Sequence, residues 1–153
     1  GALAPAVLQT YQTAYRSING QHVQVYAGVR EGLMQCRQRG WRLACVTNKP
    51  LEFARALLAH VKLDEHFVHV FGGDSFAKRK PDPMPLIEAC RALQSRPEQT
   101  LVIGDSVNDA TAARAARCPV VLMSYGYNHG QDVRALAVSG LADAVLDRMD
   151  AVP

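Results

Sequence analysis

From residue 29 onwards, short continuous apolar runs alternate with longer segments in which apolar residues recur every three or four positions. The first pattern is typical of strands buried on both faces, and the second of amphipathic helices. The predicted strands cover residues 41–47, 67–71, 100–104, 119–123 and 144–146. The predicted helices cover residues 29–39, 50–61, 84–94, 107–117 and 131–138. This alternation predicts an α/β fold, with a mostly parallel sheet between two layers of helices.

The first 27 residues do not continue this alternation. Apolar and aromatic residues at helical spacing predict a helix over residues 3–18, which Asn19-Gly20 ends. Residues 21–27 are predicted as a connector to the helix at 29–39, whose end is marked by Gly40.

The composition is that of an ordinary globular domain. The chain has 153 residues, of which 48% are hydrophobic and 20% charged, which is enough apolar content for one core. The formal net charge of +3 is too small to predict a nucleic-acid partner, and no apolar run predicts a membrane span. We expect the four widely spaced cysteines to be buried, reduced thiols in a cytoplasmic protein. They are Cys36, Cys45, Cys90 and Cys118.

The stretch Leu101-Val-Ile-Gly-Asp-Ser-Val-Asn-Asp109 combines a buried strand with two carboxylates. Asp105 ends the strand, and Asp109 falls on the same side of the helix that follows. Such oxygen ligands suit Mg²⁺, which takes one or two carboxylates together with water and phosphate oxygens. The alternative is that Asp105 or Ser106 caps the helix and Asp109 is a favourable acid in its first turn.

Further polar residues lie beyond the neighbouring strands. Thr47 and Asn48 follow the strand at 41–47, and Lys80 lies in a proline-rich loop after the strand at 67–71. A phosphate on Mg²⁺ needs hydroxyl and amide donors and a fixed cation, which these residues could supply. Alternatively, Thr47 caps the next helix and Lys80 is a solvated base. Because ligands bind at the carboxyl ends of strands in open α/β sheets, the joint occurrence favours a phosphate and metal site.

Three motifs in this order resemble those of the haloacid dehalogenase superfamily, and in particular its phosphoglycolate phosphatase branch. The matching residues are Val46-Thr47-Asn48-Lys49, Lys80-Pro81-Asp82-Pro83 and Gly104-Asp105-Ser106-Val107-Asn108-Asp109. The likeness extends from about Tyr26 to about Leu146. The resemblance implies a Rossmann-like three-layer fold, a Mg²⁺ cofactor and a small phosphorylated metabolite as substrate, with phosphoglycolate the first expectation.

The resemblance also implies a role for each matching residue. Thr47 and Asn48 would bind phosphate, and Lys80 would steady the phosphoryl group and the nucleophile. Asp105 would be a direct Mg²⁺ ligand and Asp109 an outer or water-mediated one. Ser106 and Asn108 would support them.

The chain departs from the family at its first motif. The family's Asp-x-Asp-Gly-Thr, whose first Asp forms an aspartyl-phosphate, does not occur, and the first Asp of the chain is Asp64. We therefore expect the central first strand to be missing. Residues 1–20 would be a remnant of the helical cap, and residues 21–153 an incomplete core. The start at Gly1 favours a truncated piece of a longer phosphatase, whereas a natural short relative would have to close the gap or form a homodimer through exposed sheet edges.

The sequence thus predicts the core of a Mg-dependent phosphatase, in a chain that is itself inactive because it lacks the nucleophile. The alternative is a non-catalytic module that binds phosphate or metal, or that assembles through open sheet edges. A receiver-like domain is disfavoured by Lys80 before Pro-Asp-Pro and by the late position of the acidic pair.

Arg117 stands where relatives usually have Gly, and a left-handed helix end there would cost about 1 kcal/mol.

Overall fold

Among the residues that the structure describes, six parallel strands form the main sheet, in the order β5-β4-β1-β6-β7-β8. The structure is a computed structural model that describes residues 6–10, 15–18, 22–125 and 132–152. The strands of this sheet are β1 (Ala6–Thr10), β4 (Arg42–Val46), β5 (His69–Phe71), β6 (Thr100–Gly104), β7 (Val120–Met123) and β8 (Ala144–Leu146). The predicted α/β fold with a parallel sheet is confirmed.

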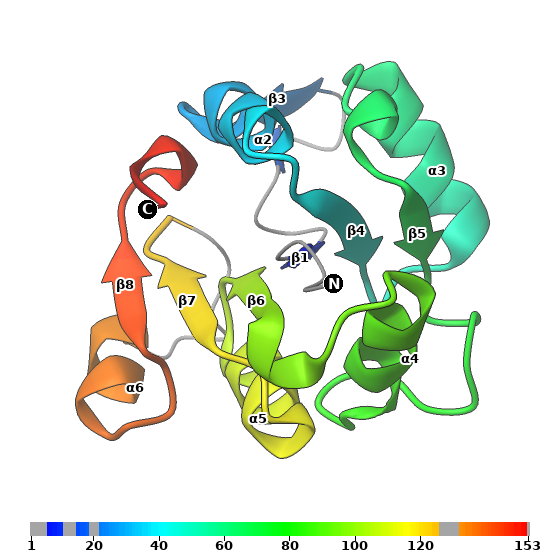
Figure 1. Cartoon of the computed structure of the whole chain (residues 1–153). Helices are drawn as coiled ribbons and strands as arrows, with labels where there is room; N and C mark the ends of the chain where they lie inside the picture. Colours follow the sequence, from blue (N-terminus) through cyan, green and yellow to red (C-terminus); the bar gives the residue numbers. More distant parts are fainter. Residues whose placement is uncertain (1–5, 11–14, 19–21, 126–131, 153) are drawn as a thin grey trace.

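Helices cover both faces of this sheet. The α-helices are α2 (Val29–Gln38), α3 (Leu51–His60), α4 (Met84–Ala92), α5 (Val107–Ala116) and α6 (Val133–Val138), and the short 3₁₀ turns are η1 (Asp64–His66), η2 (Pro97–Gln99) and η3 (Met149–Ala151). Figure 1 shows α2 on one side of the strands and α4, α5 and α6 on the other. The five predicted helices and the five predicted strands from residue 29 onwards are all present, with ends that differ by a few residues.

Alternate residues of the central strands belong to opposite layers of the core. In β4, Leu43 and Cys45 pack in the cluster formed with α2 and α3. Ala44 and Val46 of the same strand pack in the cluster formed with α4 and α5. Because both faces are covered, the four positions from Leu43 to Val46 are all buried and apolar, which explains the continuous apolar runs in the sequence.

The central position of the sheet is occupied by β1. Leu8 lies beside Ala44 of β4 and beside Val102 of β6, in parallel register with both. The expected gap at the central strand is therefore filled, and the helix predicted over residues 3–18 is wrong for the described residues of that range. Helical spacing of apolar residues cannot by itself exclude a short strand. Without β1, β4 and β6 would each leave a row of buried N–H and C=O groups unpaired.

Residues 15–18 and 22–25 form a second, two-stranded sheet. β2 (Tyr15–Ile18) and β3 (His22–Val25) pair antiparallel, with Tyr15 beside Val25. The connector predicted over residues 21–27 is therefore wrong for residues 22–25. The origin of residues 1–20 in a cap stays a prediction, although β1, from within this range, belongs to the main sheet. Most of the loop predicted over residues 124–130 lies outside the described residues.

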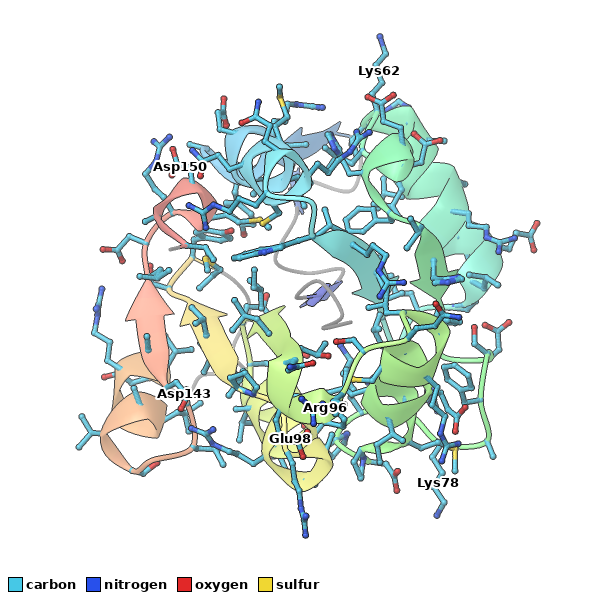
Figure 2. The ribbon with its side chains drawn as sticks, in the orientation of Figure 1. Lys62, Lys78, Arg96, Glu98, Asp143 and Asp150 are labelled. Atoms are coloured by element: carbon cyan, nitrogen blue, oxygen red, sulfur yellow. The ribbon has the colours of Figure 1, made fainter. Side chains whose placement is uncertain are left out.

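The five described α-helices end at residues with a left-handed backbone. These residues are Gly40, Lys62, Gln94, Arg117 and Gly140. In each case the next residue donates its N–H back to the last turn, as Cys118 does to Ala113 O at 2.9 Å, which is the Schellman arrangement. Lys62 extends from the end of α3 into solvent (Figure 2). Arg117, where the sequence analysis considered a left-handed helix end, has this conformation, with φ 65° and ψ 34°.

Replacing Arg117 by glycine is expected to raise the free energy of unfolding by about 1 kcal/mol, because glycine has no Cβ that disfavours this backbone conformation. Arg117 is exposed, so little packing is lost. Urea denaturation followed by circular dichroism measures the change. Thr111→Gly, at an exposed position inside the same helix, is the matched control and should lower stability by about 0.5 kcal/mol. A decrease for Arg117→Gly would contradict this account of the helix end.

Candidate phosphate and metal site

The carboxyl ends of β4 and β6 bring the predicted site residues together. Thr47 follows β4, Asp105 follows β6, and β1 lies between these two strands. The chain passes from β1 to β4 on one side and later to β6 on the other, so this edge of the sheet is a topological switch point, where ligands bind in open α/β folds. Thr47, Lys80, Asp105 and Asp109 are all buried, with exposed fractions of 1%, 5%, 1% and 2%.

Lys80 is a buried cation at this edge. Its Nζ donates hydrogen bonds to Asp109 Oδ1 at 2.9 Å and to the carbonyl oxygen of Val46 at 3.0 Å. By contrast, Lys78 is exposed and points away from the molecule (Figure 2). The alternative that Lys80 is a solvated base is therefore wrong.

Asp109 is the charged anchor of the site. Its Oδ1 accepts from Lys80, while its Oδ2 accepts from the Asp105 amide at 2.9 Å and from the Ser106 hydroxyl at 3.2 Å. Burial raises the pKa of the Asp109 carboxyl, but the Lys80 charge and the hydrogen bonds from Lys80 and Asp105 outweigh burial and leave this pKa below its usual value. A Cβ at Gly104 would collide with the Asp109 side chain, so the close approach requires glycine.

The start of α5 is compatible with both interpretations of the acidic motif, as a helix cap and as part of a phosphate and metal site. Ser106 is the N-cap, and its Oγ accepts from the Asp109 amide at 3.4 Å. Capping therefore accounts for Ser106, while Asp109 also binds the lysine. Asn108 lies partly exposed in the first helical turn, and the supporting role predicted for it stays a prediction.

Asn48 holds the loop that carries the lysine. Its Nδ2 donates to the carbonyl oxygen of Lys80 at 2.9 Å, and its Oδ1 accepts from the Lys80 amide at 3.1 Å. The next peptide bond, Lys80–Pro81, is cis. The Asn48 side chain, predicted to bind phosphate, thus binds protein backbone on both sides of Lys80. Phosphate binding through the backbone of the turn at Asn48 stays a prediction.

The turn after β4 is organised by Thr47 and by a residue that sequence reasoning missed. Thr47 Oγ1 accepts from the Lys49 amide at 3.1 Å. The amide of Leu51, at the start of α3, donates to Asp74 Oδ1 at 2.9 Å, so this amide is satisfied by Asp74 and not by Thr47, which was the alternative interpretation of Thr47. The sequence signal was the pair Gly72-Gly73. A Cβ at Gly73 would collide with the carbonyl oxygen of Asn48, so only glycine lets the loop pass this close.

A stacked aromatic pair lies near Asp105 and was also missed. The rings of Tyr26 and Tyr125 have centroids 4.0 Å apart. Burial, and after it the negative charge of Asp105, raises the pKa of the Tyr125 hydroxyl above its usual value. Tyr125 therefore lies within the electrostatic reach of the carboxylate predicted to bind Mg²⁺. The sequence places these tyrosines 99 positions apart, and neither forms part of the motifs.

The donor set fits a hydrated Mg²⁺ on one carboxylate better than a closed protein cage. In the part of the chain that the structure describes, no three or more His, Cys, Asp or Glu side chains converge on one point. Both oxygens of Asp109 bind protein donors, which suits the outer position predicted for it, while Asp105 stays the predicted direct ligand. Mg²⁺ commonly keeps several waters and binds through one or two carboxylates plus phosphate oxygens.

Replacing Asn48 by alanine is expected to lower the free energy of unfolding by about 2 kcal/mol, because the Lys80 amide and carbonyl each lose a hydrogen-bond partner. Asn48→Asp should cost as much or more, since it keeps an acceptor for the amide but places an oxygen against the carbonyl. Thermal denaturation measures both variants. Gln94→Ala, at an exposed position, is the control, expected to change stability only slightly. Equal stability of Asn48→Ala and Gln94→Ala would contradict the role given to Asn48.

The comparisons with known proteins agree with this fold. The fold and the site define a Rossmann-like α/β protein with a buried lysine–carboxylate pair at the switch point of its sheet. The family model of haloacid dehalogenase-like hydrolases matches residues 2–117. The phosphoglycolate phosphatase of Nitrosospira multiformis is 44% identical over 137 residues, which are 90% of this chain and 60% of that protein.

Two solved structures share the fold. The crystal structure of a predicted phosphoglycolate phosphatase from Haemophilus somnus is 35% identical with a TM-score of 0.79, and the match covers 85% of this chain and 56% of that one. CbbY from Rhodobacter sphaeroides, in complex with phosphate, is 25% identical with a TM-score of 0.73, covering 86% of this chain and 57% of that one.

The chain belongs to the haloacid dehalogenase-like hydrolase family, as its motifs predicted. It spans about three fifths of the length of the curated relatives it matches. Among the helices that the structure describes, none combines the length and the apolar character that a membrane crossing requires.

Proposed function

We propose that this chain carries the phosphate- and Mg²⁺-binding part of a phosphatase site that acts on a small phosphorylated metabolite, with phosphoglycolate the first candidate. The single observation that carries this proposal is the buried Lys80–Asp109 ion pair at the switch point of the sheet, where Lys80 also binds the Val46 carbonyl and Asp109 the Asp105 amide. A buried ion pair costs desolvation. A function explains this cost if Lys80 binds an anionic ligand at this edge of the sheet.

The proposed roles follow from the contacts. Lys80 has three N–H donors, of which two are accounted for by Asp109 and Val46, and the third would bind a phosphate oxygen. The Thr47 hydroxyl and the amides of the turn at Asn48 would donate to the same group. Asp105 would hold Mg²⁺, which would supply charge neutralisation for the phosphate. Asp109, Ser106 and Asn108 would keep Lys80 and the metal-binding turn in place.

Turnover through an aspartyl-phosphate would also need a nucleophilic carboxylate at the end of the central strand. In this chain the strand in that position, β1, ends in Gln9-Thr10, and neither residue is a carboxylate. We therefore propose that the 153-residue chain binds phosphate and Mg²⁺ without hydrolysing phosphate esters. A carboxylate-bearing strand in place of β1 would complete the site.

The experiment is a turnover assay of the purified chain with p-nitrophenyl phosphate and Mg²⁺. We expect no hydrolysis above the rate without protein, for the wild-type chain and for Asp105→Ala alike. Turnover by the wild-type chain that Asp105→Ala abolishes would overturn the proposed inactivity. It would at the same time support the proposed site.

The second candidate is a module that binds phosphate or metal, or that assembles with other copies, without being part of a phosphatase site, and Gln9-Thr10 at the end of the central strand favours it. Assembly through open edges has less support, because β1 pairs with both β4 and β6. The homodimer expected from those edges stays a prediction, and so does a cytoplasmic location. Analytical ultracentrifugation measures the oligomeric state. A dimer that Leu8→Pro in β1 strengthens would support strand exchange at the centre of the sheet.

A further inference from the structure

Two cysteines lie close together in the core, away from the candidate site. Cys90 in α4 and Cys118 after α5 have their Sγ atoms 3.9 Å apart, although they are 28 positions apart in the chain. Each is 2% exposed, and both are free thiols. Neither thiol contacts Lys80, Asp105 or Asp109 through a described hydrogen bond.

The backbone at both cysteines is fixed by the ends of the two helices. The carbonyl oxygen of Cys90 accepts from the Ser95 amide at 3.0 Å, and the Cys118 amide donates to Ala113 O at 2.9 Å. Next to them, the Thr100 hydroxyl lies 3.0 Å from Ser95 Oγ. A disulfide has an S–S distance of about 2 Å, so the two sulfurs must approach by about 2 Å to form one.

The other two cysteines lack this arrangement. Cys36 and Cys45 are buried in the cluster formed with α2 and α3, on the opposite face of the sheet from Cys90 and Cys118. The structure thus separates one close pair from two thiols that serve as small apolar side chains.

We propose that Cys90 and Cys118 are an oxidation site that a hydroperoxide converts into an intramolecular disulfide. The Cys90 thiolate attacks one oxygen of hydrogen peroxide, and hydroxide leaves and takes up a proton to become water. The Cys118 sulfur then attacks the resulting sulfenic acid. The S–S bond forms, the second oxygen leaves as water with the Cys118 proton, and the two electrons lost by the sulfurs have reduced the peroxide to two waters.

The local chemistry favours one order of these steps. Either sulfur can donate in the 3.9 Å contact between the two cysteines. When Cys118 donates, the hydrogen bond stabilises the Cys90 thiolate and lowers the pKa of the Cys90 thiol, against the opposing effect of burial, and it raises the pKa of Cys118. In this order Cys90 is the attacking thiolate and Cys118 the resolving thiol.

The disulfide would close a loop that contains β6, the turn Gly104–Asp109 and α5. A cross-link over this length removes conformational freedom from the unfolded chain, which should raise the melting temperature by about 10 °C. Oxidation would thus stabilise the segment that carries Asp105 and Asp109, without altering the site residues.

The test treats the purified, fully reduced chain with hydrogen peroxide under native conditions, followed by intact-mass measurement and non-reducing peptide mapping. We expect loss of the mass of two hydrogen atoms, a cross-linked Cys90–Cys118 peptide and the rise in melting temperature, all reversed by dithiothreitol. The variants Cys90→Ala and Cys118→Ala should show neither the cross-link nor the rise. The matched control Cys36→Ala/Cys45→Ala should show both.

Two results would overturn the proposal. One is a disulfide that involves Cys36 or Cys45 in the native wild-type chain. The other is a wild-type chain that gains oxygen atoms or stays unchanged, with no rise in melting temperature. Both results are measured on the wild-type chain, so they do not depend on whether the variants Cys90→Ala and Cys118→Ala fold.

Discussion

Asp109→Asn is expected to lower the free energy of unfolding by about 3 to 5 kcal/mol, because it leaves the Lys80 ammonium buried without a counter-charge. Both side chains are 3% exposed, so water cannot replace the lost carboxylate. The substitution also weakens the acceptor for the Asp105 amide and the Ser106 hydroxyl. Urea denaturation of wild type and variant, followed by circular dichroism, measures the loss.

Two further variants separate charge from packing. Glu88→Gln removes the acid of the exposed Arg91–Glu88 pair and should change stability by less than about 0.5 kcal/mol. Lys80→Met in the Asp109→Asn background removes the buried ammonium that has lost its counter-charge, and should recover part of the lost free energy of unfolding. If Asp109→Asn cost no more than Glu88→Gln, the buried pair would not be the anchor of the site.

The same pair predicts the sign of a pH dependence. Since the folded-state pKa of Asp109 lies below its unfolded value, its charge stabilises the protein above the ordinary aspartate pKa of about 4. That contribution is lost as the pH falls through the lower folded-state pKa. The stability difference between wild type and Asp109→Asn should therefore be largest near neutral pH and shrink in acid.

Leu8→Pro is expected to cost about 3 kcal/mol or more, because β1 lies in the middle of the sheet and proline has no N–H to donate to the ladder and a ring that fits poorly there. The loss should be local to the centre of the sheet. Hydrogen exchange followed by mass spectrometry should show loss of amide protection in β4 and β6.

Val23→Pro is the matched control for this substitution. Val23 lies in β3, which pairs with β2 in the separate two-stranded sheet, so protection in β4 and β6 should remain. Equal protection of β4 and β6 in wild type and Leu8→Pro would mean that β1 does not hold the central position.

The sequence predicted best where local pattern and burial agree. β6 and β8 are found at the predicted residues 100–104 and 144–146, because continuous apolar runs between polar turns leave few alternatives. The N-terminal segment was predicted wrongly because Val7 and Leu8 fit a helical stripe as well as a strand. For this segment the strand is favoured over the helix because it pairs with the otherwise unpaired edges of β4 and β6, which lie far away in the chain.

The candidate site shows the same division. The motifs correctly grouped Thr47, Lys80, Asp105 and Asp109 at one edge of the sheet. They could not show that the Asn48 side chain binds the backbone of Lys80, 32 positions away, because that contact depends on how the loops fold over the sheet. The contact between Tyr26 and Tyr125 could not be predicted either, because it also depends on how distant parts of the chain fold together.

Calorimetric titration of the chain with inorganic phosphate, with and without Mg²⁺, tests the proposed site most directly. We predict that Mg²⁺ strengthens phosphate binding and that phosphate strengthens Mg²⁺ binding by the same factor. Asp105→Asn should remove this mutual effect, whereas Lys78→Met, which changes an exposed lysine two positions from Lys80, should preserve it. Absence of phosphate binding by the folded wild-type chain would contradict the assignment of this edge as a phosphate and Mg²⁺ site. So would an Asp105→Asn variant in which Mg²⁺ still strengthens phosphate binding as much as in wild type.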